Sequence, residues 1–276
     1  MLLDQLSTLA HAPRMALFRL LMRRYPDALV AGEIAHVLGL KASTTSVYLA
    51  ALHAAGLITQ TRDGNSLRYG VDMTGARDMV AQLFGDCCNG RPDLCPTTLS
   101  QSMEKKFPMS DTKKNVLFIC TGNSARSIFA EAIMRHEAGD RFNVYSAGTT
   151  PQSELNPFVV EMLAAKGLDT NTLRAKNIAE FQGTDAPVMD FVFTVCDLAA
   201  NEECPAWHGQ PISAHWGLPD PVKATGTDAE KRLAFQQTFG AMRNRILAFS
   251  ALPMDTLSRA SLQNKVDEIG RNKDET

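Results

Sequence analysis

A cysteine and an arginine separated by five residues stand between two segments of different hydrophobic pattern. Cys120 ends the apolar run 115–120, which is typical of a buried parallel strand, and Arg126 precedes the helical pattern of residues 128–136. A loop of this length wraps backbone N–H groups around a tetrahedral oxyanion above a helix N-terminus. The Arg126 guanidinium then binds two oxygens of the anion, and we expect the positive environment to lower the pKa of the Cys120 thiol. The pattern therefore predicts a thiolate that attacks a bound oxyanion.

The predicted site extends through the loop and to one distant acid. The expected oxyanion-binding residues are Thr121, Gly122, Asn123, Ser124, Ala125 and Arg126. Ser127 is expected to hydrogen-bond the thiolate. Asp220, in the sequence Leu-Pro-Asp-Pro, is the candidate general acid for the leaving oxygen, although Asp-Pro by itself usually marks a turn. A bare Cys-x5-Arg pattern is weak, and the strand before it and the helix after it make it more specific.

Three other cysteines, Cys87, Cys88 and Cys95, lie within nine residues on a stretch rich in glycine and proline. Three thiolates without a fourth donor suit trivalent arsenic or antimony, which is soft and takes three sulfur ligands in a pyramid. Structural zinc takes four ligands, and the nearby sequence adds only Asp86 or Asp93. We therefore expect an As(III) site, with a zinc staple or plain exposed cysteines as the alternatives.

The 276 residues, of which 45% are hydrophobic and 21% charged, leave room for two domains. The net charge of -2 excludes a generally basic nucleic-acid coat. No run approaches the about 18 apolar residues of a membrane span, and the N-terminus lacks the order of a signal peptide, so we expect a cytoplasmic protein that has no contact with a membrane. A polar segment over residues 97–113 predicts a linker between a domain at 1–96 and an α/β domain at 114–270.

The segment before this linker has mostly helical spacing. A helical pattern stops at Gly39, and a second helix begins near Ser43 and carries Val47 among its apolar positions, which together predict a helix-turn-helix. Next comes an Asp-Gly pair between the runs 58–62 and 65–71, which is a hairpin signal. The expected fold of this domain is an α+β winged helix-turn-helix.

Residues 6–71 resemble the arsenic-sensing winged-helix repressor family, through the stretches 6–21, 31–58 and 61–71. The resemblance implies a homodimer that binds operator DNA with the fourth helix in the major groove. Carried over by position, the DNA-binding candidates are Ser43, Thr44, Ser46 and Tyr48 on bases and Arg62 and Arg68 on phosphates. Val47-Tyr48 departs from the Arg-His pair common in that family and leaves the operator sequence open. The alternative is a helix-turn-helix that only dimerises. Some of these repressors also carry a Cys-Cys pair followed by a third cysteine, and Cys87, Cys88 and Cys95 resemble that arrangement.

Residues 114–253 resemble the low-molecular-weight tyrosine phosphatases, an α/β fold with a parallel four-stranded sheet. The residues that carry this resemblance are Cys120 to Ser127, the sequence 145–149 and Asp220-Pro221. One branch of that fold hydrolyses phosphotyrosine and another reduces arsenate. Val222 and Lys223 occupy the places where a phosphatase more often has paired tyrosines.

Two further cysteines, Cys196 and Cys204, lie in a segment that resembles the redox loop of the reductase branch. The resemblance implies a relay in which Cys120 attacks arsenate, Cys196 attacks Cys120 and releases arsenite, and Cys204 resolves the disulfide. Seven residues separate Cys196 from Cys204, where thioredoxin-linked members commonly have six. The external reductant therefore stays open between thioredoxin and a small thiol such as glutathione, acting with glutaredoxin or mycoredoxin. Cys196 as an ordinary core thiol is the alternative.

Some reductases of this branch bind potassium near the loop, and Asn123, Glu131 and Ser146 match the positions used there. No tightly bound cofactor is expected beyond this K⁺. The combined prediction is an arsenate reductase fused to an arsenite-responsive transcriptional repressor. The alternatives are a tyrosine phosphatase with a DNA-binding domain, and a regulator whose second domain senses an anion without turnover.

Overall fold

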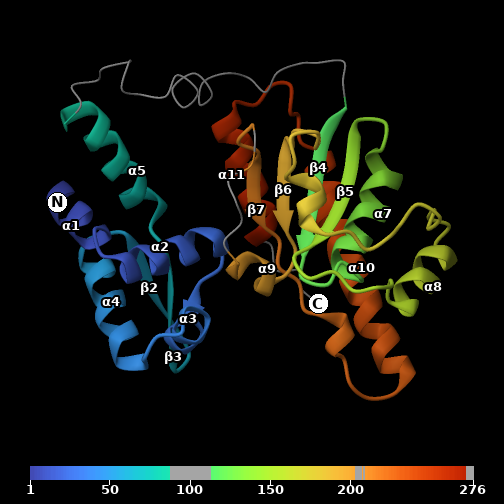
Figure 1. Ribbon diagram of the computed structural model, residues 1–276, viewed down its shortest axis with the longest axis horizontal. Helices are drawn as coiled ribbons and strands as arrows, with labels where there is room; N and C mark the ends of the chain where they lie inside the picture. The colour runs from blue at the N-terminus through green and yellow to red at the C-terminus, as the bar shows by residue number, and fades with distance from the viewer. Residues whose placement is uncertain (88–112, 203–206, 208, 272–276) are drawn as a thin grey trace. The chain divides into compact units, whose positions relative to one another are not determined.

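The computed structural model describes residues 1–87, 113–202, 207 and 209–271. The chain divides into two compact units, Met1–Lys105 and Lys106–Thr276, and Figure 1 shows the elements of each. The predicted linker 97–113 lies almost wholly outside the described residues, so the boundaries that we expected from the sequence stay a prediction.

The first unit is helical with one small sheet. Its described elements are α1 (Leu2–Leu9), α2 (Ala12–Arg24), β1 (Leu29–Val30), α3 (Ala31–Leu38), α4 (Ala42–Ala54), β2 (Ile58–Asp63), β3 (Ser66–Val71), α5 (Met73–Gln82) and the π-helical turn η1 (Leu83–Cys87). The strands are antiparallel in the order β1-β3-β2. Its core includes Leu17, Leu20, Leu21, Ile34, Leu49, Leu52 and Leu57.

The helix pair and the hairpin lie where the sequence predicts them. Gly39 ends α3 with φ 62°, a left-handed conformation that glycine adopts without steric cost. Gly64 takes φ 58° between β2 and β3, which pair from Asp63 and Ser66 onward. One expected core position was wrong: Val47 of α4 is 65% exposed. The assignment of this unit to the winged-helix fold stays a prediction.

The second unit is an α/β structure. Its described elements are β4 (Lys114–Cys120), α7 (Arg126–Ala138), β5 (Phe142–Gly148), α8 (Pro157–Ala165), η2 (Ile178–Phe181), β6 (Phe191–Thr194), α9 (Asp197–Asn201), β7 (Ile212–His215), η3 (Pro221–Lys223), α10 (Asp228–Ser250) and α11 (Arg259–Arg271). The sheet order is β5-β4-β6-β7, and all neighbouring strands are parallel. The predicted parallel four-stranded sheet is confirmed.

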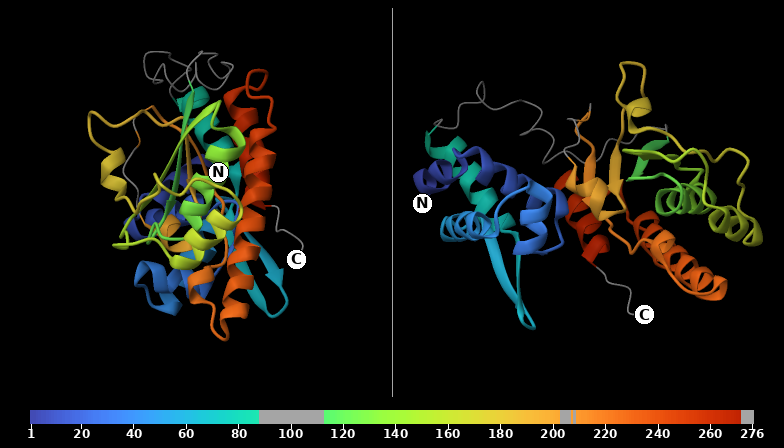
Figure 2. Two further views of the ribbon diagram at one scale, coloured as in Figure 1. Left: turned by 90° about the vertical axis from the view of Figure 1, so that its right-hand side faces the viewer. Right: turned by 60° about the horizontal axis from the view of Figure 1, so that its bottom comes forward.

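Helices and aromatic side chains hold this sheet in place. Helix α7 packs on β4 and β5, α11 packs on β7, and α10 contacts both helices (Figure 2). Phe193 and Trp216 stack with ring centroids 4.1 Å apart, and Phe249 of α10 packs edge-on against both rings. The rigid core fixes the carboxyl ends of β4 and β6, the point of a parallel sheet where the strand order reverses and ligands bind. Among the described helices, none is both long and apolar enough to span a membrane.

Candidate active site

The loop 120–126 leaves the carboxyl end of β4 and enters α7. The following segment, residues 149–156, binds the outer side of this loop through its backbone. The N–H groups of Thr149, Thr150, Gln152 and Asn156 donate to the carbonyls of Cys120, Thr121, Gly122 and Ser124, over 2.9–3.1 Å. The carbonyl dipoles are thereby directed away from the concave side of the loop.

The loop amides have the opposite orientation. Within the described part of the chain, the N–H groups of Gly122, Ser124 and Ala125 have no hydrogen-bond acceptor. A row of free amides at the start of a helix is a cradle for an anion. The arrangement supports the oxyanion loop expected from the sequence.

Two residues allow the chain to make this tight turn. Asn123 has φ 44°, and its buried side chain fixes that conformation: Oδ1 accepts from the Lys176 N–H at 2.7 Å, while Nδ2 donates to Ser127 and Ser146. Gly148 at the end of β5 lies so close that an added Cβ would come within 2.5 Å of the Thr121 carbonyl oxygen. Glycine at this position therefore lets β5 approach the loop.

The Cys120 thiol lies at the base of the loop. Its Sγ is 2.8 Å from the Ser127 hydroxyl and accepts from the Asn123 N–H at 3.1 Å. Burial nevertheless raises the pKa of Cys120 above its ordinary value, the Ser127 hydroxyl lowers it in part, and the nearby Cys196 raises it again. The predicted lowering of this pKa was therefore wrong, because burial outweighs the hydrogen bonds to the thiolate.

Arg126 and Asp220 contact each other. The Arg126 Nη2 atom is 2.9 Å from Asp220 Oδ2, and Nη1 donates to the Leu218 carbonyl at 3.0 Å. The other Asp220 oxygen accepts from the Val222 N–H at 3.2 Å. The predicted anion ligand and the predicted acid thus share one site, and the guanidinium charge is directed at the carboxylate.

Cys196 lies beside the loop, one strand away. It follows β6, the direct neighbour of β4 in the sheet, and its side chain caps α9 by accepting from the Ala199 N–H at 3.4 Å. The Thr121 hydroxyl lies 3.5 Å from the Cys196 sulfur. Cys196 is the N-cap residue of the short helix α9, and it is buried. The third predicted relay residue, Cys204, lies outside the described residues.

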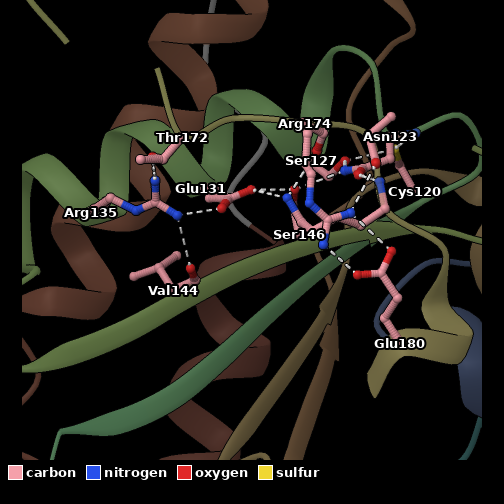
Figure 3. A network of polar contacts seen from close by, with 12 residues as sticks. Cys120, Asn123, Ser127, Glu131, Arg135, Val144, Ser146, Thr172, Arg174 and Glu180 are labelled. Atoms are coloured by element: carbon pink, nitrogen blue, oxygen red, sulfur yellow. Dashed lines mark hydrogen bonds and ion pairs between the residues drawn. The ribbon is translucent and has the colours of Figure 1, made fainter. Parts of the chain in front are cut away.

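The three residues expected to bind potassium do lie together (Figure 3). Ser146 donates to Glu131 Oε2 at 2.5 Å, and Asn123 Nδ2 donates to Ser146. Asn123 thus presents an N–H group to the cluster, since its oxygen accepts from the Lys176 backbone. The Lys176 ammonium itself bonds Glu131 Oε2 at 2.9 Å, and Arg135 bonds the other oxygen. The residues do not fit a potassium ion, because an ammonium group already holds the carboxylate and the amide offers no oxygen.

The predicted DNA-binding residues of the first unit lie on α4 and the hairpin. Ser43 and Ser46 are exposed, although the Ser46 hydroxyl donates to the Ala42 carbonyl, and Thr44 is half-buried. Tyr48 is also half-buried, with its ring 5.1 Å from that of His11.

The two hairpin arginines differ in their exposure and in their contacts. Arg62 is exposed, whereas Arg68 bonds the Asp63 carboxylate at 2.7 Å and the Ala28 carbonyl at 3.2 Å. Of the predicted As(III) ligands, Cys87 ends η1 and is exposed, while Cys88 and Cys95 lie outside the described residues.

Sequence reasoning missed two residues of this site. Lys176 lies 53 positions after Asn123, which it bonds, and no local motif marks it. Gly148 was part of a recognised stretch, but its close approach to the loop appears only once β5 pairs with β4. The one signal for Lys176 was indirect, because a buried glutamate such as Glu131 needs a positively charged partner.

This chain is similar in sequence to known arsenate reductases. The arsenate reductase of Bacillus licheniformis is 37% identical over 142 residues, which cover 50% of this chain and 96% of that protein. The arsenate reductase of Bacillus subtilis is 35% identical over 140 residues, covering 50% and 95%. A solved thioredoxin-dependent arsenate reductase from Corynebacterium glutamicum aligns at 21% identity with a TM-score of 0.37, over 78% of this chain and 91% of that one. The family model described as low molecular weight phosphotyrosine protein phosphatase matches residues 115–264. The chain therefore belongs to the low molecular weight phosphotyrosine protein phosphatase family.

Proposed function

We propose that the second unit is an arsenate reductase that works by a thiol relay. The observation that carries this proposal is the second buried thiol, Cys196, which lies beside the loop that holds Cys120. A phosphate ester needs one nucleophile for hydrolysis, whereas reduction by thiols needs two sulfur atoms to supply two electrons. The named activity of the Bacillus relatives supports the same choice.

The first step forms a bond between Cys120 and arsenic. The loop amides and Arg126 bind arsenate, and Arg126 exchanges Asp220 for two arsenate oxygens. The Cys120 proton passes to the bound dianion, Sγ attacks arsenic, and the As–S bond forms. The Asp220 carboxylate, freed from the guanidinium, takes up this proton from the arsenate and returns it to the departing hydroxide, so that one As–O bond breaks and water leaves.

The second step is the reduction. Cys196 passes its proton to an oxygen of the bound arsenic and attacks the Cys120 sulfur, an S–S bond forms, and the S–As bond breaks. Its electron pair stays on arsenic, so As(V) becomes As(III) and leaves as arsenite, while the two cysteines are oxidised to a disulfide. Cys204 then attacks Cys196, and an external thiol reductant, thioredoxin or glutathione with glutaredoxin, restores the thiols.

An arsenate reduction assay with each reductant tests this proposal. We expect turnover in the wild type, none in Cys120→Ser, and in Cys196→Ser a Cys120–arsenic adduct from which the protein alone releases no arsenite. Hydrolysis of an aryl phosphate by the wild type without thiol consumption, together with no arsenate reduction, would contradict it and favour a phosphatase. Full arsenate resistance of cells that carry Cys120→Ser would favour a non-catalytic anion sensor.

We propose that the first unit is an arsenite-responsive repressor that binds operator DNA as a homodimer. The exposed polar residues of α4, the exposed Arg62 and the exposed Cys87 at the end of η1 support this role. A mobility shift on the promoter of the chain's own gene tests it. We expect arsenite to release the wild type but not a variant with serine at residues 87, 88 and 95, and release of that variant would refute the sensor.

A further inference from the structure

The position of Lys176 leads to an inference about cation requirement, which rests on the proposed reductase site. Lys176 is only 7% exposed, and its backbone is fixed on both sides: its N–H donates to Asn123 Oδ1 at 2.7 Å and its carbonyl accepts from the Gly148 N–H at 2.8 Å. The ammonium group is directed at Glu131, whose side chain is 3% exposed. The lysine therefore helps to hold the loop through its backbone contacts with Asn123 and Gly148.

The ammonium group has the partners that a bound monovalent cation would take. Nζ donates to Glu131 Oε2 at 2.9 Å and to the Arg174 carbonyl at 2.9 Å. A carboxylate and a backbone carbonyl are typical oxygen ligands of hard cations. An uncompensated Glu131 carboxylate would be costly at this depth, and the Lys176 and Arg135 cations compensate it.

A continuous set of hydrogen bonds joins this cation to the nucleophile (Figure 3). Glu131 accepts from Ser146, Ser146 accepts from Asn123, and Asn123 also donates to Ser127. The last member of the network, the Ser127 hydroxyl, is 2.8 Å from the Cys120 sulfur. Glu131 thus lies at the other end of the network that holds Asn123 and Ser127 under the thiol.

We propose that Lys176 is a positioning residue whose ammonium group replaces an alkali cation, so that oxyanion binding and turnover by this chain do not depend on potassium. The lysine acts through Glu131 and Asn123 and does not touch the substrate. The loop amides therefore keep the geometry that binds the anion whatever monovalent ion is in solution.

Phosphate affinity, measured by calorimetry on the full-length chain, tests this independently of arsenate chemistry. At constant ionic strength in tetramethylammonium, sodium or potassium chloride, we expect one affinity and one thermal midpoint for the wild type. A potassium-specific gain in either quantity would overturn the inference, since an ion that binds the folded state raises its stability. These readouts do not require arsenate turnover, so they stay informative if the proposed reductase activity fails.

Variants sharpen the test. In Lys176→Ala we expect phosphate affinity in tetramethylammonium chloride to fall about tenfold, which is about 1.4 kcal/mol. Potassium, but not tetramethylammonium, should restore part of that loss by occupying the space beside Glu131. The matched control is Lys265→Met, which removes an exposed lysine that pairs with Glu268, and it should leave phosphate affinity unchanged. Unchanged phosphate affinity in folded Lys176→Ala would overturn the proposal, and if that variant fails to fold, the wild-type ion series still decides.

Discussion

The two units present their candidate residues in opposite ways. In the second unit Cys120 and the polar residues of the network beneath it are buried, and hydrogen bonds join side chains that come from several elements. In the first unit none of the six candidates on α4 and the hairpin is fully buried: three are exposed and three are half-buried. The difference follows from the chemistry proposed for each unit. A reaction on a small anion needs groups held in place before the anion binds, whereas a phosphate backbone is met by side chains at the surface. We therefore expect single substitutions to have large effects in the loop and small ones in the hairpin.

Among the substitutions that test this difference, we expect Asp220→Asn to have the largest effect, which is on arsenate turnover. The change removes the acid for the leaving oxygen, so arsenate turnover should fall about 10²- to 10⁴-fold. It also weakens the hold of the carboxylate on Arg126, which lies 2.9 Å away, so phosphate should bind at least as tightly as in the wild type. Steady-state kinetics and calorimetry separate the two effects. Equal losses in both would show that Asp220 only shapes the site.

The pH dependence of Cys120 gives a second test. Because burial raises the pKa of this thiol, its reactive thiolate is scarce at neutral pH and increases as the pH rises toward the raised pKa. The rate of alkylation of Cys120 by iodoacetamide should therefore rise about tenfold per pH unit through neutral and mildly alkaline pH. Mass spectrometry of the alkylated peptide measures this. A rate that is already flat at neutral pH would mean that the pKa is lowered, as the sequence suggested.

Ser127→Ala serves as the control for that measurement. The Ser127 hydroxyl lowers the Cys120 pKa, so its removal should shift the alkylation profile further to alkaline pH. A profile that does not move would show that the hydroxyl does not stabilise the thiolate.

The sequence predicted the loop and the sheet better than the network beneath them. Cys120, Arg126 and the strand before them form a local pattern, so their geometry follows from a dozen consecutive residues. The raised pKa of Cys120 and the pairing of Arg126 with Asp220 depend on burial and on residues nearly a hundred positions apart. Lys176 was missed for the same reason, since its contact with Glu131 exists only in the folded chain. In the first unit, Gly39 and Gly64 marked the turns correctly because a left-handed φ is a local property.

Gly148→Ala tests how tightly the loop is held, with an effect of intermediate size. The added Cβ would lie 2.5 Å from the Thr121 carbonyl oxygen, so the loop or β5 has to shift. We expect a loss of about 1–3 kcal/mol in the free energy of unfolding, together with weaker phosphate binding. Gly183→Ala is the matched control, because a Cβ at Gly183 meets no atom within 4 Å. Normal stability and phosphate affinity in Gly148→Ala would show that the loop is more compliant than its contacts imply.

Arg62→Ala should have the smallest effect, and it tests the other side of the comparison. Arg62 is exposed on β2, so its removal should leave the stability of the chain unchanged and weaken operator binding about equally for all DNA sequences. The slope of log affinity against log salt should fall by about one, the contribution of one phosphate contact. Arg68→Ala is the informative partner, because Arg68 also bonds Asp63 and the Ala28 carbonyl within the first unit. The loss of those bonds should lower the thermal midpoint as well as the DNA affinity. If Arg62→Ala instead abolished binding to one operator while sparing others, Arg62 would be reading bases, and the surface of this unit would be as finely positioned as the oxyanion loop.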